Sequence, residues 1–346
     1  MHCKFFIYIV LSAFLSFPLS EAIAAKPARL IYCSVGFNPV AQAGSAQVLA
    51  VLEFKKSLER LSSGVFRVRI AWDNGLAPNY ATAQRSLLGD KIHFTQFSSS
   101  SLAAFTSAIL PLSTLFLFKY PDMTLPQAAL DGPVGARIRD RTIRETGLRI
   151  LAFWELGYRH LTSSTKQLNT LESIKGEKWR IQPNPVYEDA FRRLGMLPVS
   201  LSWQQLYEVL RVKGVSGSDN TLAGIEAGHL YEVQKNLLLT GHGFEFLCIM
   251  TSERFYKSLS ETERRQWDKA IVEATQVYRK NFAHNSVTQE QKLRKRMHVW
   301  EMTAEQRKTF EELVAPSREI AAQRSGQKYY TEIMDAIKAL RPPAPK

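Results

Sequence analysis

The chain has 346 residues, and its 45 Lys and Arg against 32 Asp and Glu give a formal net charge of +13. Such a length can bury the cores of two lobes of ordinary size. A basic balance can indicate nucleic acid, a membrane surface or small anions as partners. The basic residues are dispersed except at 292–296, which is interpreted as a solvated helix face. No arginine-rich tail or stacking-aromatic motif is present, so nucleic acid is not expected as a partner.

Residues 1–24 have the pattern of a secretory signal peptide. Lys4 supplies the positive segment, 5–17 the apolar core, and Ala22-Ile23-Ala24 the small-residue cleavage pattern. Cleavage is expected after Ala24, with Ala25 as the alternative site. An uncleaved anchor is the other alternative. The pattern predicts export, and the expected location is the periplasm of a Gram-negative type of cell.

Two further patterns are interpreted as buried core. The uncharged stretch 92–118 is long enough to raise the question of a membrane span, but Pro111 and the serine run 98–101 interrupt it. A buried strand, a loop and a second buried segment are expected there. Of the cysteines, Cys33 and Cys248 remain after cleavage, each in an apolar segment. Two free thiols are expected, with a disulfide as the alternative.

Strand and helix signals alternate along the first part of the mature chain. Apolar spacing predicts helices over 47–61 and 82–88, and strands over 29–35, 66–72 and 92–97. Strands that alternate with helices are typical of a largely parallel sheet covered on both faces.

The alternation returns later in the chain. Strands are predicted over 148–158, 178–182, 231–239 and 246–250, with helices between them. Capping boxes are expected at the helix starts Ser202/Gln205, Ser260/Glu263 and Thr303/Gln306. Because 261–315 contains neither Gly nor Pro, the C-terminal quarter is predicted to be helical. Two α/β halves with a helical tail fit a hinged receptor that holds its ligand in the crevice between lobes.

Two arginines carry the functional hypothesis. Arg159 and Arg180 each follow or sit in an apolar, strand-like segment, where a guanidinium is partly dehydrated and must find an anion. A planar guanidinium offers parallel donors that match both oxygens of a carboxylate. Two such groups and a nearby amide would make a carboxylate receptor. The alternative for each is a structural ion pair, for Arg159 with a residue such as Glu155.

These arginines belong to an ordered set of motifs that resembles a known family. The set runs through 147–162, Lys178-Trp179-Arg180-Ile181-Gln182-Pro183, Gly217-Ser218-Asp219-Asn220 and 231–235. It is similar to the substrate-binding proteins of tripartite ATP-independent periplasmic (TRAP) transporters, the DctP family. The resemblance covers nearly the whole mature chain and is strongest from Asp131 to about Trp267. It implies an α/β, two-lobed periplasmic binding protein fold with hinge strands and a long helix that spans both lobes.

Mapped onto this chain, the resemblance implies a first lobe of 25–156 plus 243–285. The second lobe would be 157–242 plus 286–346, including the helical tail. The hinge strands would lie at 153–158 and 240–246, and part of 261–302 would form the helix shared by both lobes.

The resemblance also implies ligand-contacting residues. Arg180 matches the arginine that holds a substrate carboxylate in a two-pronged salt bridge, and Arg159 matches one that can assist it. Asn220 matches a ligand-contacting asparagine, although the run 216–221 departs from the usual pattern. Asn79 replaces an acidic residue of many relatives, which favours a more acidic or differently shaped ligand. A helix cap or an Asx turn is the alternative for both asparagines.

Three further positions complete the candidate site. Ser99 lies in the serine run 98–101, where the first lobe's crevice loop is expected, and hydroxyls at a helix start suit anions. Trp203 and Phe246 could line the pocket, with a place in the core as the alternative. His242 is interpreted as a hydrogen-bonding residue of the hinge.

The sequence carries none of the motifs of a nucleophile, a metal site, a P-loop or a dinucleotide site. We therefore expect a receptor without catalysis, cofactor or metal, acting as a monomer. It would capture a small organic acid, a C4-dicarboxylate or related carboxylate, and deliver it to integral-membrane TRAP permease subunits. The alternatives are a secreted enzyme or a ligand-sensing partner on a similar scaffold. The identity of the acid stays open.

Overall fold

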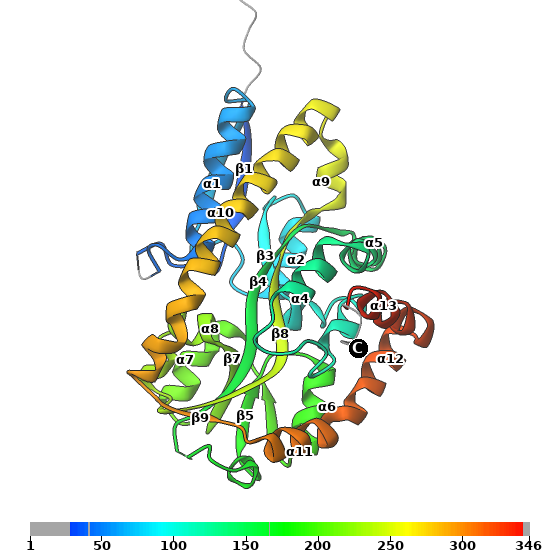
Figure 1. The fold of residues 1–346 in the computed structure, drawn as a ribbon. Helices are drawn as coiled ribbons and strands as arrows, with labels where there is room; N and C mark the ends of the chain where they lie inside the picture. The colour runs from blue at the N-terminus through cyan, green and yellow to red at the C-terminus, as the bar shows by residue number, and fades with distance from the viewer. Residues whose placement is uncertain (1–27, 41, 166, 342–346) are drawn as a thin grey trace, which may run out of the picture.

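The structure is a computed structural model that describes residues 28–40, 42–165 and 167–341. The predicted signal peptide and its cleavage site lie outside the described residues. Within them the molecule is elongated, with two halves stacked along its length (Figure 1). Helices and strands mix throughout, so the predicted α/β class is confirmed.

Two long antiparallel strands run through both halves. They are β4 (Leu148–Ser163) and β8 (Asn236–Ser252), paired from Leu148↔Ser252 to Ser163↔Asn236 with three irregularities in register. Both predicted hinge segments, 153–158 and 240–246, lie within these strands. The strand expected over 231–239 begins only at Asn236, because a short helical turn occupies 230–232.

The main sheet has the order β3-β8-β4-β7-β5-β6, with β9 paired to the far end of β8. The prediction of a largely parallel sheet is wrong for this sheet, because β4 pairs antiparallel with both β7 and β8, and so does β3 with β8. Parallel pairing is confined to β5–β6, β5–β7 and β8–β9, and to the separate pair β1–β2. The other strands are β1 (Arg29–Ser34), β2 (Phe66–Ala71), β3 (Thr95–Ser98), β5 (Lys178–Ile181), β6 (Leu197–Ser200), β7 (Gly217–Thr221) and β9 (His298–Glu301).

One long helix connects the two halves. Helix α10 (Glu261–Arg294) starts at the predicted Ser260/Glu263 capping box, packs along α1 in the upper half and ends in the lower half (Figure 1). The C-terminal quarter is not wholly helical, because the chain turns after Arg294 and adds β9 to β8. The other two predicted capping boxes are present, at Ser202 and Thr303.

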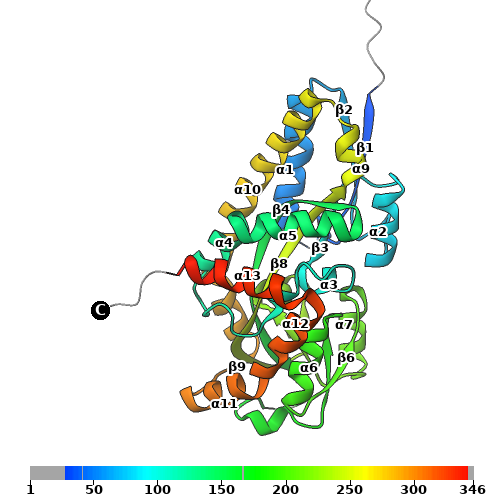
Figure 2. The same cartoon turned by 90° about the vertical axis from the view of Figure 1, so that its right-hand side faces the viewer.

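The remaining helices cover the sheet from both sides (Figure 2). They are α1 (Ala46–Leu61), α2 (Tyr80–Leu88), α3 (Ser99–Leu102), α4 (Thr124–Asp131), α5 (Pro133–Thr146), α6 (Pro185–Arg193), α7 (Trp203–Arg211), α8 (Leu222–Ala227), α9 (Glu253–Ser258), α11 (Ala304–Val314), α12 (Arg318–Ser325) and α13 (Gln327–Ala339). No helix in the described part of the chain is long and apolar enough to cross a membrane. Cys33 and Cys248 are both buried free thiols.

The apolar core is divided in the same way as the two halves. Two clusters fill the upper half, around Phe54 and Trp267 and around Phe97 and Phe153. Two others fill the lower half, around Trp179 and around Leu206 and Leu210. The predicted lobe boundaries stay a prediction, but the tail does not pack as one unit.

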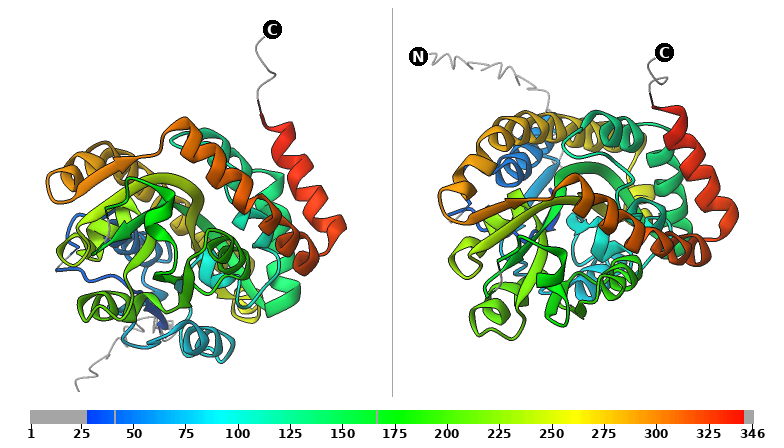
Figure 3. Two further views of the ribbon diagram at one scale, coloured as in Figure 1. Left: turned by 90° about the horizontal axis from the view of Figure 1, so that it is seen from below. Right: turned by 60° about the horizontal axis from the view of Figure 1, so that its bottom comes forward.

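Helices α11 and α12 of the tail pack on α6 in the lower half, whereas α13 returns to α5 in the upper half (Figure 3). Ile333 and Ile337 of α13 enter the cluster around Phe97. The tail therefore contacts both halves.

Candidate functional site

A cavity of about 100 Å³ lies between the two halves. Loops, strands and the starts of α1 and α2 of the upper half form one wall, and Gln182 after β5 forms the other with β7, α7 and α8 of the lower half. One water needs about 10–15 Å³ of such space, so this cavity has room for several waters or a small organic ion. Its lining consists of Gly36, Phe37, Gln42, Gln47, Asn74, Tyr80, Gln96, Ser98, Leu156, Arg159, Gln182, Trp203, Gln204, Asn220, Thr221, Ala223, Gly224, Ala227, Glu245 and Leu247.

Arg159 lines the cavity, but its guanidinium is already held by internal acids. Its Nε donates to Asp219 Oδ2 at 2.5 Å, its Nη1 to Glu245 Oε2 at 2.5 Å, and its Nη2 to the Asp219 carbonyl at 2.8 Å. Burial alone would lower the pKa of Arg159, but Asp219 and Glu245 outweigh it and raise that pKa. The suggested partner Glu155 is wrong, since that carboxylate pairs with Arg279 of α10 at 2.8 Å.

The two acids that hold Arg159 have further partners of their own, although Asp219 Oδ1 is buried without a hydrogen-bond partner among the described residues. Burial opposes ionisation of Asp219, but Arg159 and His242 keep the pKa of its carboxyl well below the ordinary range. Glu245 on β8 accepts from Ser99 Oγ, from the backbone N of Ser100 at 3.1 Å and from Ser100 Oγ at 2.7 Å. Ser99 therefore orients a cavity-lining carboxylate, while its neighbour Ser98 lines the cavity itself.

Arg180 presents the opposite situation. Its side chain is fully buried, and Nε donates to the Leu201 carbonyl at 3.0 Å. Both Nη atoms are buried and have no hydrogen-bond partner among the described residues. Burial, with the like charge of Arg159, lowers the pKa of Arg180 to about 10, so the group is still a cation near neutral pH. The charges of Asp219 and Glu245 oppose this shift, but neither acid is hydrogen-bonded to the Nη atoms. A buried cation without a bonded anion is costly.

The guanidinium of Arg180 is not part of the cavity lining, but it lies next to that wall. Gln182, two residues further along the same chain segment, lines the cavity, and so does Trp203, two residues after Leu201. Its charge also interacts with Tyr80, Arg159 and Glu245, which all line the cavity. Arg180 thus adjoins the site from the lower half.

Asn220 and Trp203 are brought to the cavity, as the sequence predicted. Asn220 is buried on β7, where its Oδ1 accepts from the backbone N of Thr221 at 2.9 Å. Its Nδ2 is buried without a partner in the described part of the chain. One end of this side chain is therefore held by the neighbouring backbone, and the other end is an open donor. Trp203 is half-buried at the start of α7 and contributes apolar surface.

Two predicted residues lie elsewhere. Asn79 is exposed and caps α2, with Oδ1 accepting from the backbone N of Thr82 at 2.9 Å. Phe246 is buried in the upper core, in an edge-to-face contact with Phe153. Neither lines the cavity, so the helix-cap and core alternatives describe their surroundings. Asn74 and Leu247, which lie nearby in the sequence, line the cavity instead.

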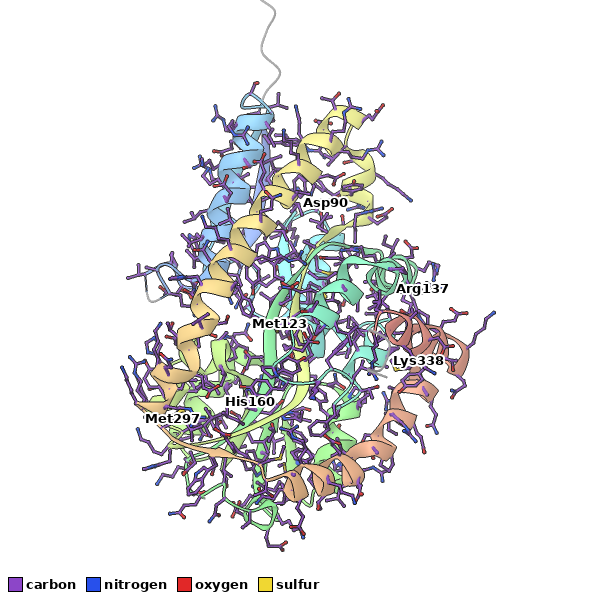
Figure 4. All side chains as sticks on the ribbon, viewed as in Figure 1. Asp90, Met123, Arg137, His160, Met297 and Lys338 are labelled. Carbon is purple, nitrogen blue, oxygen red and sulfur yellow. The ribbon has the colours of Figure 1, made fainter. Side chains whose placement is uncertain are left out.

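Behind Arg159 lies a buried histidine pair on the two long strands. His242 Nδ1 is 2.7 Å from Thr240 Oγ1, so His242 is a hydrogen-bonding residue of the predicted hinge, as expected. His160, labelled in Figure 4, accepts from the Gly241 backbone N at 3.1 Å. Burial, together with His242 and Arg159, lowers the pKa of His160 to about 3, and burial also lowers the pKa of His242 despite Asp219. Both rings are therefore neutral near pH 7.

The described residues hold no cluster of His, Cys, Asp or Glu arranged to bind a metal. Four residues of the site were not predicted from the sequence, namely Asp219, Glu245, Gln96 and Gln182. Asp219 precedes Asn220 in the motif Gly217-Ser218-Asp219-Asn220, and an acid at a buried strand position would have been the signal. Gln96 and Gln182 at strand ends carried no signal that distinguished them from surface amides.

Comparison with known proteins agrees with this geometry. Residues 37–324 match the DctP family, described as "Bacterial extracellular solute-binding protein, family 7". The chain is 25% identical to the C4-dicarboxylate-binding periplasmic protein DctP of Rhodobacter capsulatus over 94% of each chain. It resembles the crystal structure of the sugar acid binding protein DctPAm of Advenella mimigardefordensis in complex with galactonate, with a TM-score of 0.83 and 26% identity over 90% of this chain and 98% of that one.

A TRAP periplasmic solute-binding protein of Shewanella oneidensis with bound succinate has the same two-lobed fold, with a TM-score of 0.81 over 90% of this chain and all of that one. At 21% identity this likeness concerns the fold alone. The family match covers most of the chain, and the resemblance read from the arginine motifs is confirmed. The chain belongs to the DctP family, the substrate-binding proteins of TRAP transporters.

Proposed function

We propose that this protein is a periplasmic receptor that captures a small organic acid through Arg180 and delivers it to the membrane permease of a TRAP transporter. The observation that carries the proposal is the fully buried guanidinium with two unpartnered Nη atoms beside an interlobe cavity. An anion that entered this region would satisfy the two unpartnered Nη atoms and gain two charge-assisted hydrogen bonds.

The two arginines take different roles in this proposal. Arg159 is neutralised by Asp219 and Glu245, so it fixes the geometry of the cavity floor and attracts an anion only weakly. Arg180 has no acid partner among the described residues and binds the carboxylate. Asn220 adds its open Nδ2 donor. The ligand enters while the halves are apart, and closure of the halves then brings the carboxylate to Arg180.

The proposal includes the location of the protein in the cell. We infer that residues 1–24 direct export and are removed after Ala24, which places the receptor in the periplasm. There it would pass its ligand to integral-membrane permease subunits and catalyse nothing itself. The family match supports this role, since the named relatives are binding proteins.

Substitution of Arg180 tests the proposal. A thermal-shift screen against organic acids first identifies a ligand, because a ligand at 100 times its Kd adds about 2.7 kcal/mol of stability. Removing one partner of a buried charge pair costs about 2–5 kcal/mol, so Arg180→Met should raise the Kd by roughly thirty- to several-thousand-fold. Arg180→Lys keeps the charge but loses the paired donors, so its Kd should lie between those of the wild type and Arg180→Met. Isothermal titration calorimetry measures all three proteins.

The matched control is Arg192→Met, which removes an exposed arginine of α6 that pairs with Glu188 at 2.8 Å. Its Kd should equal that of the wild type. Circular dichroism establishes that each variant is folded. Near-normal affinity in folded Arg180→Met would remove Arg180 from the site and end the proposal in this form.

A further inference from the structure

Carboxamide side chains dominate the polar wall of the interlobe cavity. They come from both halves, and they are Gln42, Gln47, Asn74, Gln96, Gln182, Gln204 and Asn220. Each carboxamide offers two donors and one acceptor without bringing a charge. A wall of this composition matches a ligand that presents several groups able both to donate and to accept hydrogen bonds.

The charged groups of the same wall already pair within the protein. Arg159 and Glu245 line the cavity and pair with each other at 2.5 Å, and Arg159 also pairs with Asp219 at 2.5 Å, so two acids share one cation. Among the described residues at the site, Arg180 is the cation that keeps two unpartnered donors. A ligand with one carboxylate can be neutralised there. A second carboxylate would meet no unpaired cation and would stand near the Glu245 carboxylate, which disfavours a dianion.

Individual polar atoms point to hydroxyl groups. Gln96 Oε1 is buried and has no donor in the described part of the chain, and Asn220 Nδ2 is buried and has no acceptor there. If the Gln96 amide is rotated, the open position becomes a donor, and a partner is still required. A hydroxyl can serve as donor to one and acceptor to the other, whereas an ionised carboxylate has no donor to offer. An apolar acid would leave both atoms unpaired, at a cost of about 1–3 kcal/mol each.

The apolar part of the wall suits the carbon skeleton of such a ligand. Phe37, Tyr80 and Trp203 contribute aromatic surface, and Leu156 and Leu247 add aliphatic surface. Sites of this kind combine apolar surface with a few polar groups that fix the orientation of the ligand. A polyhydroxylated chain presents C–H groups to the rings and hydroxyls to the amides.

We propose that the ligand is a polyhydroxylated monocarboxylate, of the class that includes the aldonic acids, rather than a dicarboxylate or an unsubstituted fatty or aromatic acid. This inference rests on the proposed function, because it assumes that a carboxylate is bound through Arg180. The amides of the cavity select hydroxyl groups, and the two acids that share Arg159 disfavour a second negative charge on the ligand.

Carbon-matched acids test the selection by isothermal titration calorimetry at near-neutral pH. The hydroxylated members are erythronate, gluconate and galactonate, the unsubstituted members are butanoate and hexanoate, and the dicarboxylates are succinate and adipate. The neutral polyol galactitol completes the set. At least one hydroxylated acid should bind ten or more times more tightly than every other compound. A dicarboxylate or an unsubstituted acid that bound most tightly would overturn the ligand class and leave the proposed function standing.

Two other outcomes bear on the proposed function. If galactitol bound as tightly as the hydroxylated acids, the carboxylate would contribute nothing and the role of Arg180 would be refuted, while selection for hydroxyls would stand. If no acid of any class bound, both proposals would fail.

A variant separates hydroxyl recognition from general loss of binding. Gln96→Met keeps the length of the side chain and removes both hydrogen-bonding functions. It should weaken the best hydroxylated acid by roughly three- to tenfold, the equivalent of one hydrogen bond. The unsubstituted acid should be unaffected or bind more tightly. Gln323→Met, at an exposed glutamine of α12, is the control. Equal weakening of both acids by Gln96→Met would contradict recognition of hydroxyl groups by this amide.

Discussion

At the residue scale, two fully buried arginines differ in their hydrogen-bond partners. Arg159 donates to Asp219 and Glu245, whereas Arg180 donates only through Nε, to a backbone carbonyl, among the described residues. The difference decides which of them is available to a ligand. A saturated guanidinium orients the site, and an unsaturated one retains the capacity to bind an anion.

This contrast predicts opposite effects on the stability of the unliganded protein. Arg180→Met removes a buried charge that lacks an acid partner, so the melting temperature should not fall below that of the wild type. Arg159→Met leaves Asp219 and Glu245 without their cation and should lower the free energy of unfolding by about 3–5 kcal/mol. Chemical denaturation of the two variants at neutral pH measures both effects. A large loss in Arg180→Met would mean that this arginine is a structural ion pair instead.

The sequence predicted part of this site. Burial of Arg159 and Arg180 followed from their apolar strand segments, because a charge enclosed by such residues is dehydrated. The partners of Arg159 could not be read in the same way, since Asp219 and Glu245 lie 60 and 86 residues away along the chain. Asn79 was misplaced because a helix-capping asparagine and a ligand-facing one look alike in sequence. Only the path of the chain distinguishes them.

At the element scale, β4 and β8 determine the architecture. The sequence predicted one strand over 148–158 and two separate strands over 231–239 and 246–250. The structure extends the first to Ser163 and joins the other two into one strand from Asn236 to Ser252. Local pattern could not predict this continuity, because antiparallel pairing between residues far apart supplies the hydrogen bonds. The capping boxes, which depend on residues three apart, were predicted correctly.

The histidines on these two strands make stability depend on pH. His160 and His242 have lowered pKa values in the folded state and ordinary values near 6.5 when unfolded. Between the two values the unfolded chain binds more protons, so stability must fall as the pH drops below about 6.5. Each histidine contributes up to about 1.4 kcal/mol per pH unit. Asp219, whose pKa is also lowered, adds to the loss at still lower pH.

Melting temperatures from pH 7.5 to 5 measure this effect. His160→Gln should reduce the slope with pH, even where it lowers stability at every pH. His284→Gln, at an exposed histidine of α10, should leave the slope of the wild type unchanged. An unchanged slope in His160→Gln would mean that His160 titrates normally in the folded protein.

At the scale of the whole molecule, the cavity exists because two halves meet. Its lining comes from both of them, and Arg180 approaches from the lower half while Tyr80 and Gln96 belong to the upper half. Helix α10, the paired strands and the tail all cross from one half to the other (Figure 1). The sequence indicated two halves and a long shared helix. It did not indicate the return of α13 to the upper half, because the apolar stripe of an amphipathic helix does not specify which surface the helix packs against.

A crystal structure of the protein with its tightest-binding acid tests the central claim most directly. Both Nη atoms of Arg180 should donate to the two oxygens of one ligand carboxylate, at about 2.7–2.9 Å. Arg159 should keep its bonds to Asp219 and Glu245. A carboxylate bound elsewhere, with the guanidinium of Arg180 unpaired or joined to an acid of the protein, would contradict the account.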